Sequence, residues 1–213
     1  VQKTDDEKKK VIILEKAIDL ISNEKQLLGN LEREEIEYLN TFQLISIKPV
    51  VFVCNVDEDS AVNGNEFTKQ INEYAKKNNS EVLLVSAKIE SEISQISDEN
   101  EKKEFLESLG LIETGLKRVI RKGYEILNYI NFFTAGEKEL RAWTIVKGSL
   151  APTAAGTIHS DMEKGFIRAE TISYNDYIQF NGEAGSKEKG KLRLEGKEYV
   201  VQDGDVMHFL FNV

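Results

Sequence analysis

A short apolar run that ends in acidic residues, at positions 50–58, constrains the fold of this chain most strongly. The run reads Val-Val-Phe-Val-Cys and is followed by Asn55, Val56, Asp57 and Glu58. Five consecutive apolar residues, rich in β-branched and aromatic types, predict a strand that is buried on both faces, as in a parallel sheet. A second run at 82–85, Val-Leu-Leu-Val, precedes Ser86, Ala87 and Lys88 and predicts a second buried strand.

An amphipathic segment, residues 65–77, lies between the two runs. Its apolar residues at helical spacing are Phe67, Ile71 and Tyr74. They predict a helix, so the three segments form a βαβ unit whose strands end at the same edge of the sheet. Ligands of open α/β sheets bind at that edge. We therefore expect Asn55, Glu58 and residues 86–88 to converge there, in an arrangement that suits the hydrogen-bonding edge of a nucleobase.

Residues 1–45 are highly charged and predict two helices. The apolar residues at spacings of three and four are Val11, Leu14, Ile18 and Ile21. They give one apolar stripe on a solvated helix, and a second helix is expected at 32–42 after a break at residues 29–30. Together they predict a coiled-coil-like hairpin. Such a hairpin can be an arm that holds two parts of a protein together, or a clamp for a partner or a nucleic acid.

The composition changes near residue 132, where strand-like runs alternate with glycine-rich turns. The strand-like runs are 141–146, 165–169, 199–201 and 207–211, and a helix at 151–159 opens with Pro152 in its first turn. Before them, residues 115–128 predict a helix whose inner face carries Leu116, Val119, Ile120, Ile126 and Leu127. Strands mixed around one short helix predict a small α+β domain of β-grasp type.

Composition excludes several classes of protein. A formal net charge of -9 argues against a broad surface for polyanions, because phosphate affinity comes mostly from Lys and Arg. The single cysteine, Cys54, rules out an internal disulfide framework and fits the cytoplasm. No apolar run approaches the roughly 20 residues that span a bilayer, so no membrane partner is expected, and no secretory signal is visible. The chain begins with Val rather than Met, and we expect a fragment that lacks an N-terminal portion.

Two groups of motifs resemble known families. Asn55-Val56-Asp57-Glu58 and Ser86-Ala87-Lys88 are similar to the fourth and fifth nucleotide-binding motifs of P-loop GTPase-fold proteins. Residues 131–139, 141–144 and 191–205 resemble the C-terminal TGS domain of the YchF family of Obg-related NTPases. The resemblance covers most of the chain and is strongest from Lys48 onward.

The resemblance implies an α/β chain with three parts. These are a helical coiled-coil arm at 1–45, the C-terminal part of a nucleotide-binding G domain with a parallel sheet at 46–130, and a β-grasp (ubiquitin-like) TGS domain at 131–213. It also implies that the complete protein binds and hydrolyses ATP, or less readily GTP, with Mg²⁺. The ribosome or RNA is the expected partner, and no DNA is expected.

The resemblance also implies a nucleotide-base site. Its expected residues are Asn55, Val56, Glu58, Ser86, Ala87 and Lys88. Asn55 would orient the loop, the backbone N–H of Ala87 would face the base, and the stem of Lys88 could cover the ring.

The acid of this site differs from that of GTPases. GTPases carry Asn-Lys-x-Asp here, and its carboxylate accepts two hydrogen bonds from guanine; this chain has Val56 and Glu58 at the Lys and Asp positions. Adenine presents an acceptor where guanine presents a ring N–H. A carboxylate in the guanine-reading pose would then be unpaired, at a cost of about 1–3 kcal/mol, although Glu58 need not adopt that pose.

Motifs for phosphate chemistry are missing from the sequence. A Walker A loop needs Gly-x-x-x-x-Gly-Lys-Ser/Thr around the phosphates and Mg²⁺. Only Gly190 and Gly196 are followed by Lys, and Leu192 and Glu198 stand where the hydroxyl is required. No Asp-x-x-Gly is present either. We therefore expect no catalytic residue and no metal ligand in this chain, and no hydrolysis by it alone.

Other polar residues have ordinary structural interpretations. Asp57 and Asp59 are expected to be solvated loop acids, and Cys54 a small apolar strand residue. His208 is expected at a surface or edge position, and His159 at a capping or packing position near a helix end.

A basic cluster stands out in the acidic chain, at Lys187, Lys189, Lys191, Arg193 and Lys197. It is either solvated surface or a contact for RNA. A second hypothesis for the whole chain follows from it, namely a non-catalytic RNA- or protein-binding module built on the helical arm and the TGS domain.

Overall fold

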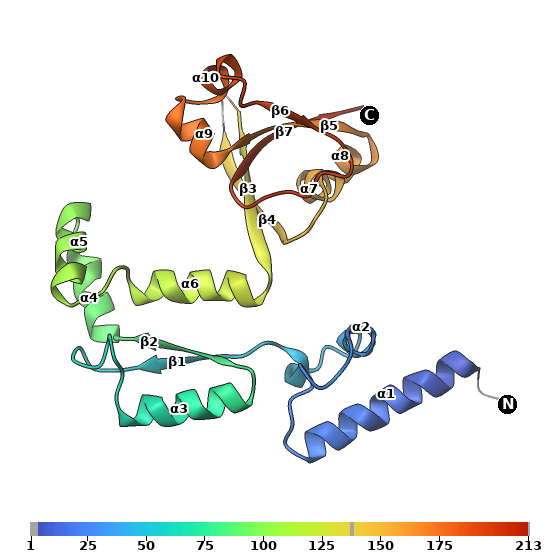
Figure 1. Ribbon diagram of the computed structural model, residues 1–213, viewed down its shortest axis with the longest axis vertical. Helices are drawn as coiled ribbons and strands as arrows, with labels where there is room; N and C mark the ends of the chain where they lie inside the picture. The colour runs from blue at the N-terminus through green and yellow to red at the C-terminus, as the bar shows by residue number, and fades with distance from the viewer. Residues whose placement is uncertain (1–3, 137–138, 213) are drawn as a thin grey trace. The chain divides into compact units, whose positions relative to one another are not determined.

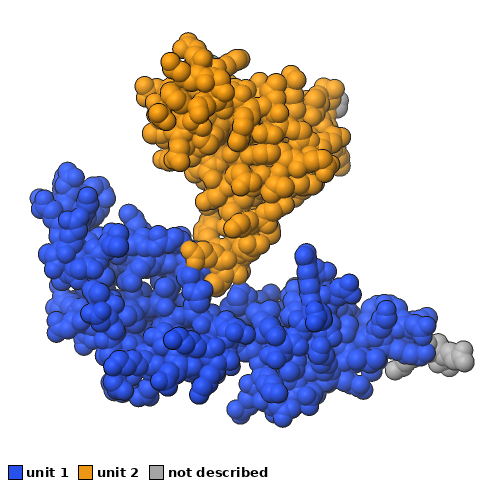
Figure 2. All heavy atoms as spheres, in the orientation of Figure 1, with its two compact units in different colours: residues 1–122 blue, residues 123–213 orange. Residues whose placement is uncertain are grey.

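The computed structural model describes residues 4–136 and 139–212. The chain divides into two compact units, residues 1–122 and 123–213 (Figure 2). The first unit holds a two-stranded sheet, β1-β2, and the second a five-stranded sheet in the order β4-β3-β7-β5-β6 (Figure 1). The predicted mixture of a parallel α/β part and a mixed-sheet part is confirmed. The three-part division at residues 45 and 130 stays a prediction.

The N-terminal residues form two helices, as predicted. α1 (Asp5–Ser22) begins with a capping box between Thr4 and Glu7, and α2 (Arg33–Asn40) is followed by the 3₁₀ helix η1 (Ile45–Ile47). Side chains of all three share a small core whose buried members are Ala17, Leu27, Leu39 and Ile47. The predicted stripe is partly wrong, because Ile18 and Ile21 are exposed. The face around Ala17 packs against α2 instead.

The central βαβ unit is confirmed. β1 (Val51–Asn55) and β2 (Glu81–Val85) are parallel and in register from Val51↔Glu81 to Asn55↔Val85, and α3 (Glu66–Lys77) connects them. The prediction that β1 is buried on both faces is wrong, since Val53 is 50 % exposed. Among the described residues this sheet has two strands, and α3 packs against them while Val53 lies open to solvent.

Three more helices complete the first unit. α4 (Ala87–Gln95) and α5 (Glu99–Ser108) were not predicted; they enclose a core with Ala61, Ile89, Ile93, Leu106 and Leu111. α6 (Gly115–Ile126) matches its prediction in extent and continues past residue 122. Its N-terminus is capped by Glu90, whose Oε1 accepts a hydrogen bond from the Gly115 N–H at 2.6 Å.

The predicted inner face of α6 is largely wrong. Leu116, Ile120 and Leu127 are exposed, and only Val119 and Ile126 are half-buried. α6 is anchored through polar contacts instead: the Arg118 Nη2 donates to the carbonyl of Leu84 at 2.8 Å.

The second unit is a five-stranded mixed sheet with short helices. Its elements are β3 (Tyr129–Ala135), β4 (Leu140–Val146), α7 (Ala151–Ile158), α8 (Ser160–Lys164), β5 (Phe166–Ser173), α9 (Tyr174–Gln179), α10 (Glu183–Glu188), β6 (Arg193–Glu195) and β7 (Asp205–Phe211). β3 and β7 are parallel, and the other neighbours are antiparallel. Pro152 lies in the first turn of α7, as predicted. Residues 199–201 form only an isolated bridge, Leu150↔Val200, rather than a strand.

The core of the second unit lies between the sheet and α7. Phe132, Ala154, Ala155, Ala169 and Met207 are fully or almost fully buried there. The small residues of α7 allow the helix to lie close to the sheet (Figure 1). The motif residues Glu137 and Lys138 lie outside the described residues. In the described ranges, no helix has the length and apolar character needed to cross a bilayer.

Candidate functional site

The exits of β1 and β2 lie side by side. The pairing Asn55↔Val85 is the last of the ladder, and the Val56 N–H donates to the Val85 carbonyl at 2.9 Å just beyond it. Asn55 and Ser86 therefore leave the sheet next to each other, and the residues after them form two adjacent loops. This is the edge at which parallel sheets bind ligands.

Two side-chain contacts connect these loops. The Oδ1 of Asn55 accepts a hydrogen bond from the Ala87 N–H at 3.0 Å. The Nζ of Lys88 donates to the Oε2 of Glu58 at 2.6 Å. This hydrogen bond and the charge of Glu58 raise the pKa of Lys88 above its usual value. The structure thus brings Asn55, Glu58, Ala87 and Lys88 together.

The Ala87 N–H has a partner within the chain, and its predicted role at a base stays a prediction. It was expected to face a base, but in this structure it donates to Asn55. The predicted role of Asn55, to orient the loop, agrees with that contact. The side chain of Val56 is buried, so this residue can offer a ligand only its backbone.

Ser86 has a buried hydroxyl without a partner. The residue is 3 % exposed, and its Oγ makes no hydrogen bond among the described residues. Buried polar groups are nearly always paired, so an orphan of this kind needs an explanation such as an absent ligand or water. Next to the two loops, Asp57 has a structural role, because its Oδ1 accepts a hydrogen bond from the Ser60 N–H at 2.9 Å.

The basic cluster of the second unit is only partly free. Lys191 pairs with Asp176 at 3.5 Å, and Arg193 pairs with Glu195 and Asp205, each at 3.3 Å. Lys187, Lys189 and Lys197 are exposed and form no ion pair within the described part of the chain. Three of the five residues of the basic cluster can therefore bind a polyanion without breaking an ion pair among the described residues.

A buried polar network around Asp205 was not predicted. Asp205 accepts hydrogen bonds from the Tyr199 hydroxyl at 2.7 Å, the Gln202 N–H at 2.9 Å and the Arg193 Nη2 at 3.3 Å. Burial, together with the hydrogen bond to Asp205, raises the pKa of Tyr199. Residues 203–205, Asp-Gly-Asp, favour a turn, but nothing in the sequence indicates that the last of them is buried.

The two histidines occupy a capping position and a surface position. His159 begins α8 as its N-cap, where Nδ1 accepts a hydrogen bond from the Asp161 N–H at 3.2 Å, so the predicted capping role is confirmed. His208 is exposed on β7, which is a surface position although β7 is not an edge strand.

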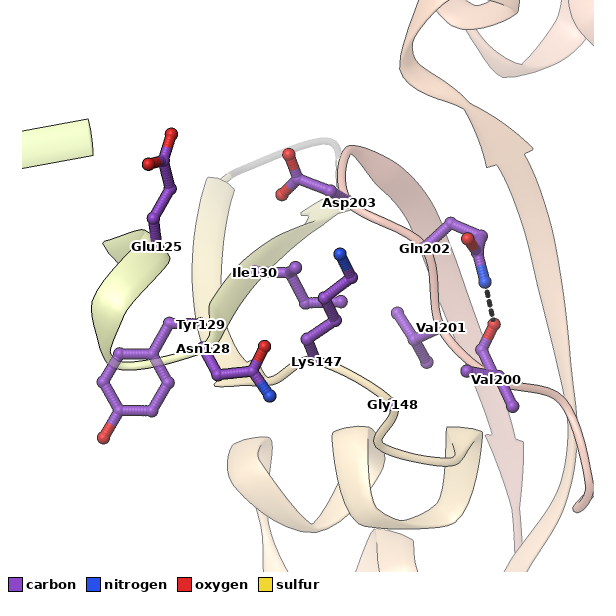
Figure 3. Close-up of a pocket in the computed structure, with 10 residues that line it drawn as sticks. All are labelled: Glu125, Asn128, Tyr129, Ile130, Lys147, Gly148, Val200, Val201, Gln202 and Asp203. Atoms are coloured by element: carbon purple, nitrogen blue, oxygen red, sulfur yellow. Dashed lines mark hydrogen bonds between the residues drawn. The ribbon is translucent and has the colours of Figure 1, made fainter. Parts of the chain in front are cut away.

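A cavity of about 750 Å³ lies in the second unit (Figure 3). Its lining includes the buried side chains of Ile130 and Val201 and the polar side chains of Asn128, Lys147 and Gln202 (Figure 3). No sequence pattern indicates this cavity, because its lining comes from three segments that are far apart along the chain. Its polar groups carry charges of both signs and define no single ligand class.

Comparisons with known proteins agree on one family. A family model named YchF-GTPase_C, described as "Protein of unknown function (DUF933)", matches residues 129–212. "Ribosome-binding ATPase YchF" of Haemophilus influenzae is 51 % identical over 202 residues, which are 94 % of this chain and 55 % of that protein. The protein of the same name from Bacillus subtilis is 50 % identical over 94 % of this chain and 56 % of its own length.

A solved structure gives the same result. The Schizosaccharomyces pombe YchF GTPase superposes with a TM-score of 0.81 at 33 % identity, covering 95 % of this chain and 55 % of that one. The chain therefore spans just over half the length of the relatives it matches. It belongs to the YchF family, and it corresponds to the C-terminal part of those proteins.

Proposed function

We propose that this chain supplies the base-reading half of an ATP-preferring P-loop NTPase of the YchF type. The observation that carries the proposal is the convergence of Asn55, Glu58, Ala87 and Lys88 from two parallel strand exits, with the orphan hydroxyl of Ser86 beside them. The names of the bacterial relatives, which call them ribosome-binding ATPases, support the reaction class. Val56 and Ser86 complete the proposed base site.

The preference for ATP follows from the acid of the site. Glu58 stands where GTPases have an Asp, and in this structure its carboxylate is engaged by Lys88. A carboxylate that is oriented and partly occupied by Lys88 is less free to turn both oxygens toward the two donors of guanine. In the complete protein, the phosphates and Mg²⁺ are held by residues that this chain does not contain, and no step of hydrolysis is assigned to its residues.

The remaining parts have accessory roles in this proposal. Residues 1–45 are a coiled-coil arm, 46–130 the C-terminal part of the G domain, and 131–213 a β-grasp TGS domain. The five-stranded sheet with α7 on one face supports the last assignment. The complete protein binds the ribosome, as the names of its relatives suggest, and we place that function in the cytoplasm.

The test is nucleotide binding by a protein that joins this chain to the N-terminal half of a YchF relative. Calorimetry is expected to give tighter binding of ATP than of GTP. Asn55→Ala is expected to weaken both by about tenfold, because it removes the amide that connects the two loops. Asn72→Ala, an exposed change on α3, is the matched control. Tight GTP binding without ATP binding would reject the proposal.

The second candidate function is RNA binding through the basic cluster. The three exposed lysines without ion pairs, Lys187, Lys189 and Lys197, favour it. Their replacement by Glu is expected to lower retention of a ribosomal RNA fragment by about tenfold or more, with a weaker dependence on salt. Replacement of three exposed lysines of the first unit, Lys8, Lys69 and Lys103, is the control for net charge. An equal loss of RNA retention in both triple variants would count against a specific RNA-binding surface at the basic cluster.

A further inference from the structure

The ion pair between Lys88 and Glu58 affects whether the site prefers adenine or guanine. This inference rests on the proposed function. The two side chains come from different loops, one after each strand, and meet at 2.6 Å. Asp59 and Glu92 also act on the Lys88 charge, but through space only, and the hydrogen bond goes to Glu58 alone. In this structure the pair turns the Glu58 carboxylate toward Lys88.

Guanine and adenine make different demands on that carboxylate. Guanine offers two adjacent donors, a ring N–H and an exocyclic amino group, and a carboxylate reads them with both of its oxygens. In this structure the Oε2 of Glu58 is already bound by the ammonium of Lys88. Adenine offers a single amino donor next to an acceptor, and it needs at most one free carboxylate oxygen.

We infer that Lys88 is a specificity-determining residue, which disfavours guanine by holding one oxygen of Glu58. Lys88 is a positioning residue for the Glu58 carboxylate. This role is separate from the predicted packing of its aliphatic chain against the base ring. Exposed ion pairs contribute little to folding. Removing the ammonium therefore changes the choice of base without unfolding the chain.

The experiment compares AMP and GMP, which differ only in the base. Each is titrated into the full chain, and binding is followed by the amide NMR shifts of residues 55–60 and 86–88. The variants are Lys88→Met, Glu58→Gln and the double variant, with Lys69→Met in α3 as the control for loss of a paired lysine. Melting temperatures confirm that each variant is folded.

Lys88→Met is expected to raise GMP affinity relative to AMP by about fivefold. The effect should vanish in the Glu58→Gln background, because Lys88 acts through that carboxylate. Lys88→Arg, which keeps the ion pair, should retain the preference of the unchanged chain. Two results would overturn this inference but leave the proposed function intact. One is an unchanged ratio of AMP to GMP affinity in Lys88→Met. The other is an equal change in that ratio when Lys88→Met is made in the Glu58→Gln background. If neither nucleotide shifts these amides in the unchanged chain, the proposed base site itself fails.

Discussion

Single side chains decide how the two strand exits become a site. The sequence predicted which residues follow the strands, because a buried strand and its exit are local patterns. It did not predict that the Ala87 N–H would donate to Asn55, or that Lys88 would pair with Glu58. Those contacts join residues 30 and 32 positions apart, so they depend on the register of β1 and β2, which only the folded sheet fixes.

Asp205 carries a buried charge in the second unit. It is 2 % exposed and accepts three hydrogen bonds, one of them from Arg193. Asp205→Asn keeps the shape but replaces one acceptor by a donor, and it leaves Arg193 without that charge. We expect a loss of about 2 kcal/mol in the free energy of unfolding. Urea unfolding followed by the fluorescence of Trp143, the only tryptophan, reports on this unit.

The neighbouring acid provides the control for that prediction. Asp203 is exposed, and its Oδ1 accepts a hydrogen bond from the Asn131 N–H at 2.9 Å, which an Asn can replace. Asp203→Asn should therefore change stability by less than about 0.5 kcal/mol. A similar loss of unfolding free energy in the two variants would mean that the buried charge of Asp205 does not explain the destabilisation.

At the scale of elements, strongly periodic segments were predicted well and polar ones were not. The extents of α6 and α7 and the positions of β4, β5 and β7 agree with the sequence patterns. α5 was missed because apolar residues are sparse in Glu-Asn-Glu-Lys-Lys-Glu; it is held by the cap Asp98 and by the buried Leu106 near its end. The inner face of α6 was assigned from periodicity alone. Periodicity locates an apolar stripe on a helix, but it does not show which other element, if any, packs against that stripe.

The pairing of β5 with β7 gives a prediction at this scale. Gly165 precedes β5, and a Cβ at this position would overlap the backbone carbonyl of Asn212, which follows β7. The Asn212 N–H also donates to the Gly165 carbonyl at 3.0 Å. Gly165→Ala must therefore separate the ends of the two strands, and we expect a loss of about 2–3 kcal/mol in unfolding free energy.

Amide hydrogen exchange checks where that loss arises. Protection should fall first at the C-terminal end of β7 and at the start of β5. Gly196→Ala is the matched control, since no atom lies within 4 Å of a Cβ built there. Its exchange pattern and stability should match those of the unchanged chain, and equal effects of both substitutions would contradict a local steric cause.

At the scale of the whole molecule, the chain brings the proposed base-site residues together, and its sequence holds no Walker A loop. The sequence indicated the lack of that loop, because a Walker A loop is a contiguous motif whose absence can be read directly. It could not indicate that the chain would divide at residue 122, because that boundary falls inside α6, with no linker composition to mark it.

Hydrolysis is the test at this scale. The chain alone, incubated with ATP and Mg²⁺, should release no phosphate above the rate of buffer, because its sequence holds no Walker A loop to surround the phosphates. The joined protein with the N-terminal half of a relative is the positive control. Phosphate release by the chain alone that is lost in Asn55→Ala would contradict the assignment of chemistry to the other half.

The open face of β1 has a consequence for handling the protein in solution. Val53 in β1 and Leu116 in α6 expose apolar surface in the first unit, at 50 % and 60 %, in a chain with a formal net charge of -9. Mutual repulsion keeps such molecules apart in dilute buffer, whereas about 1 M salt shortens the reach of that repulsion to roughly 3 Å. Light scattering should therefore detect a single species at low ionic strength and growing particles as salt is added.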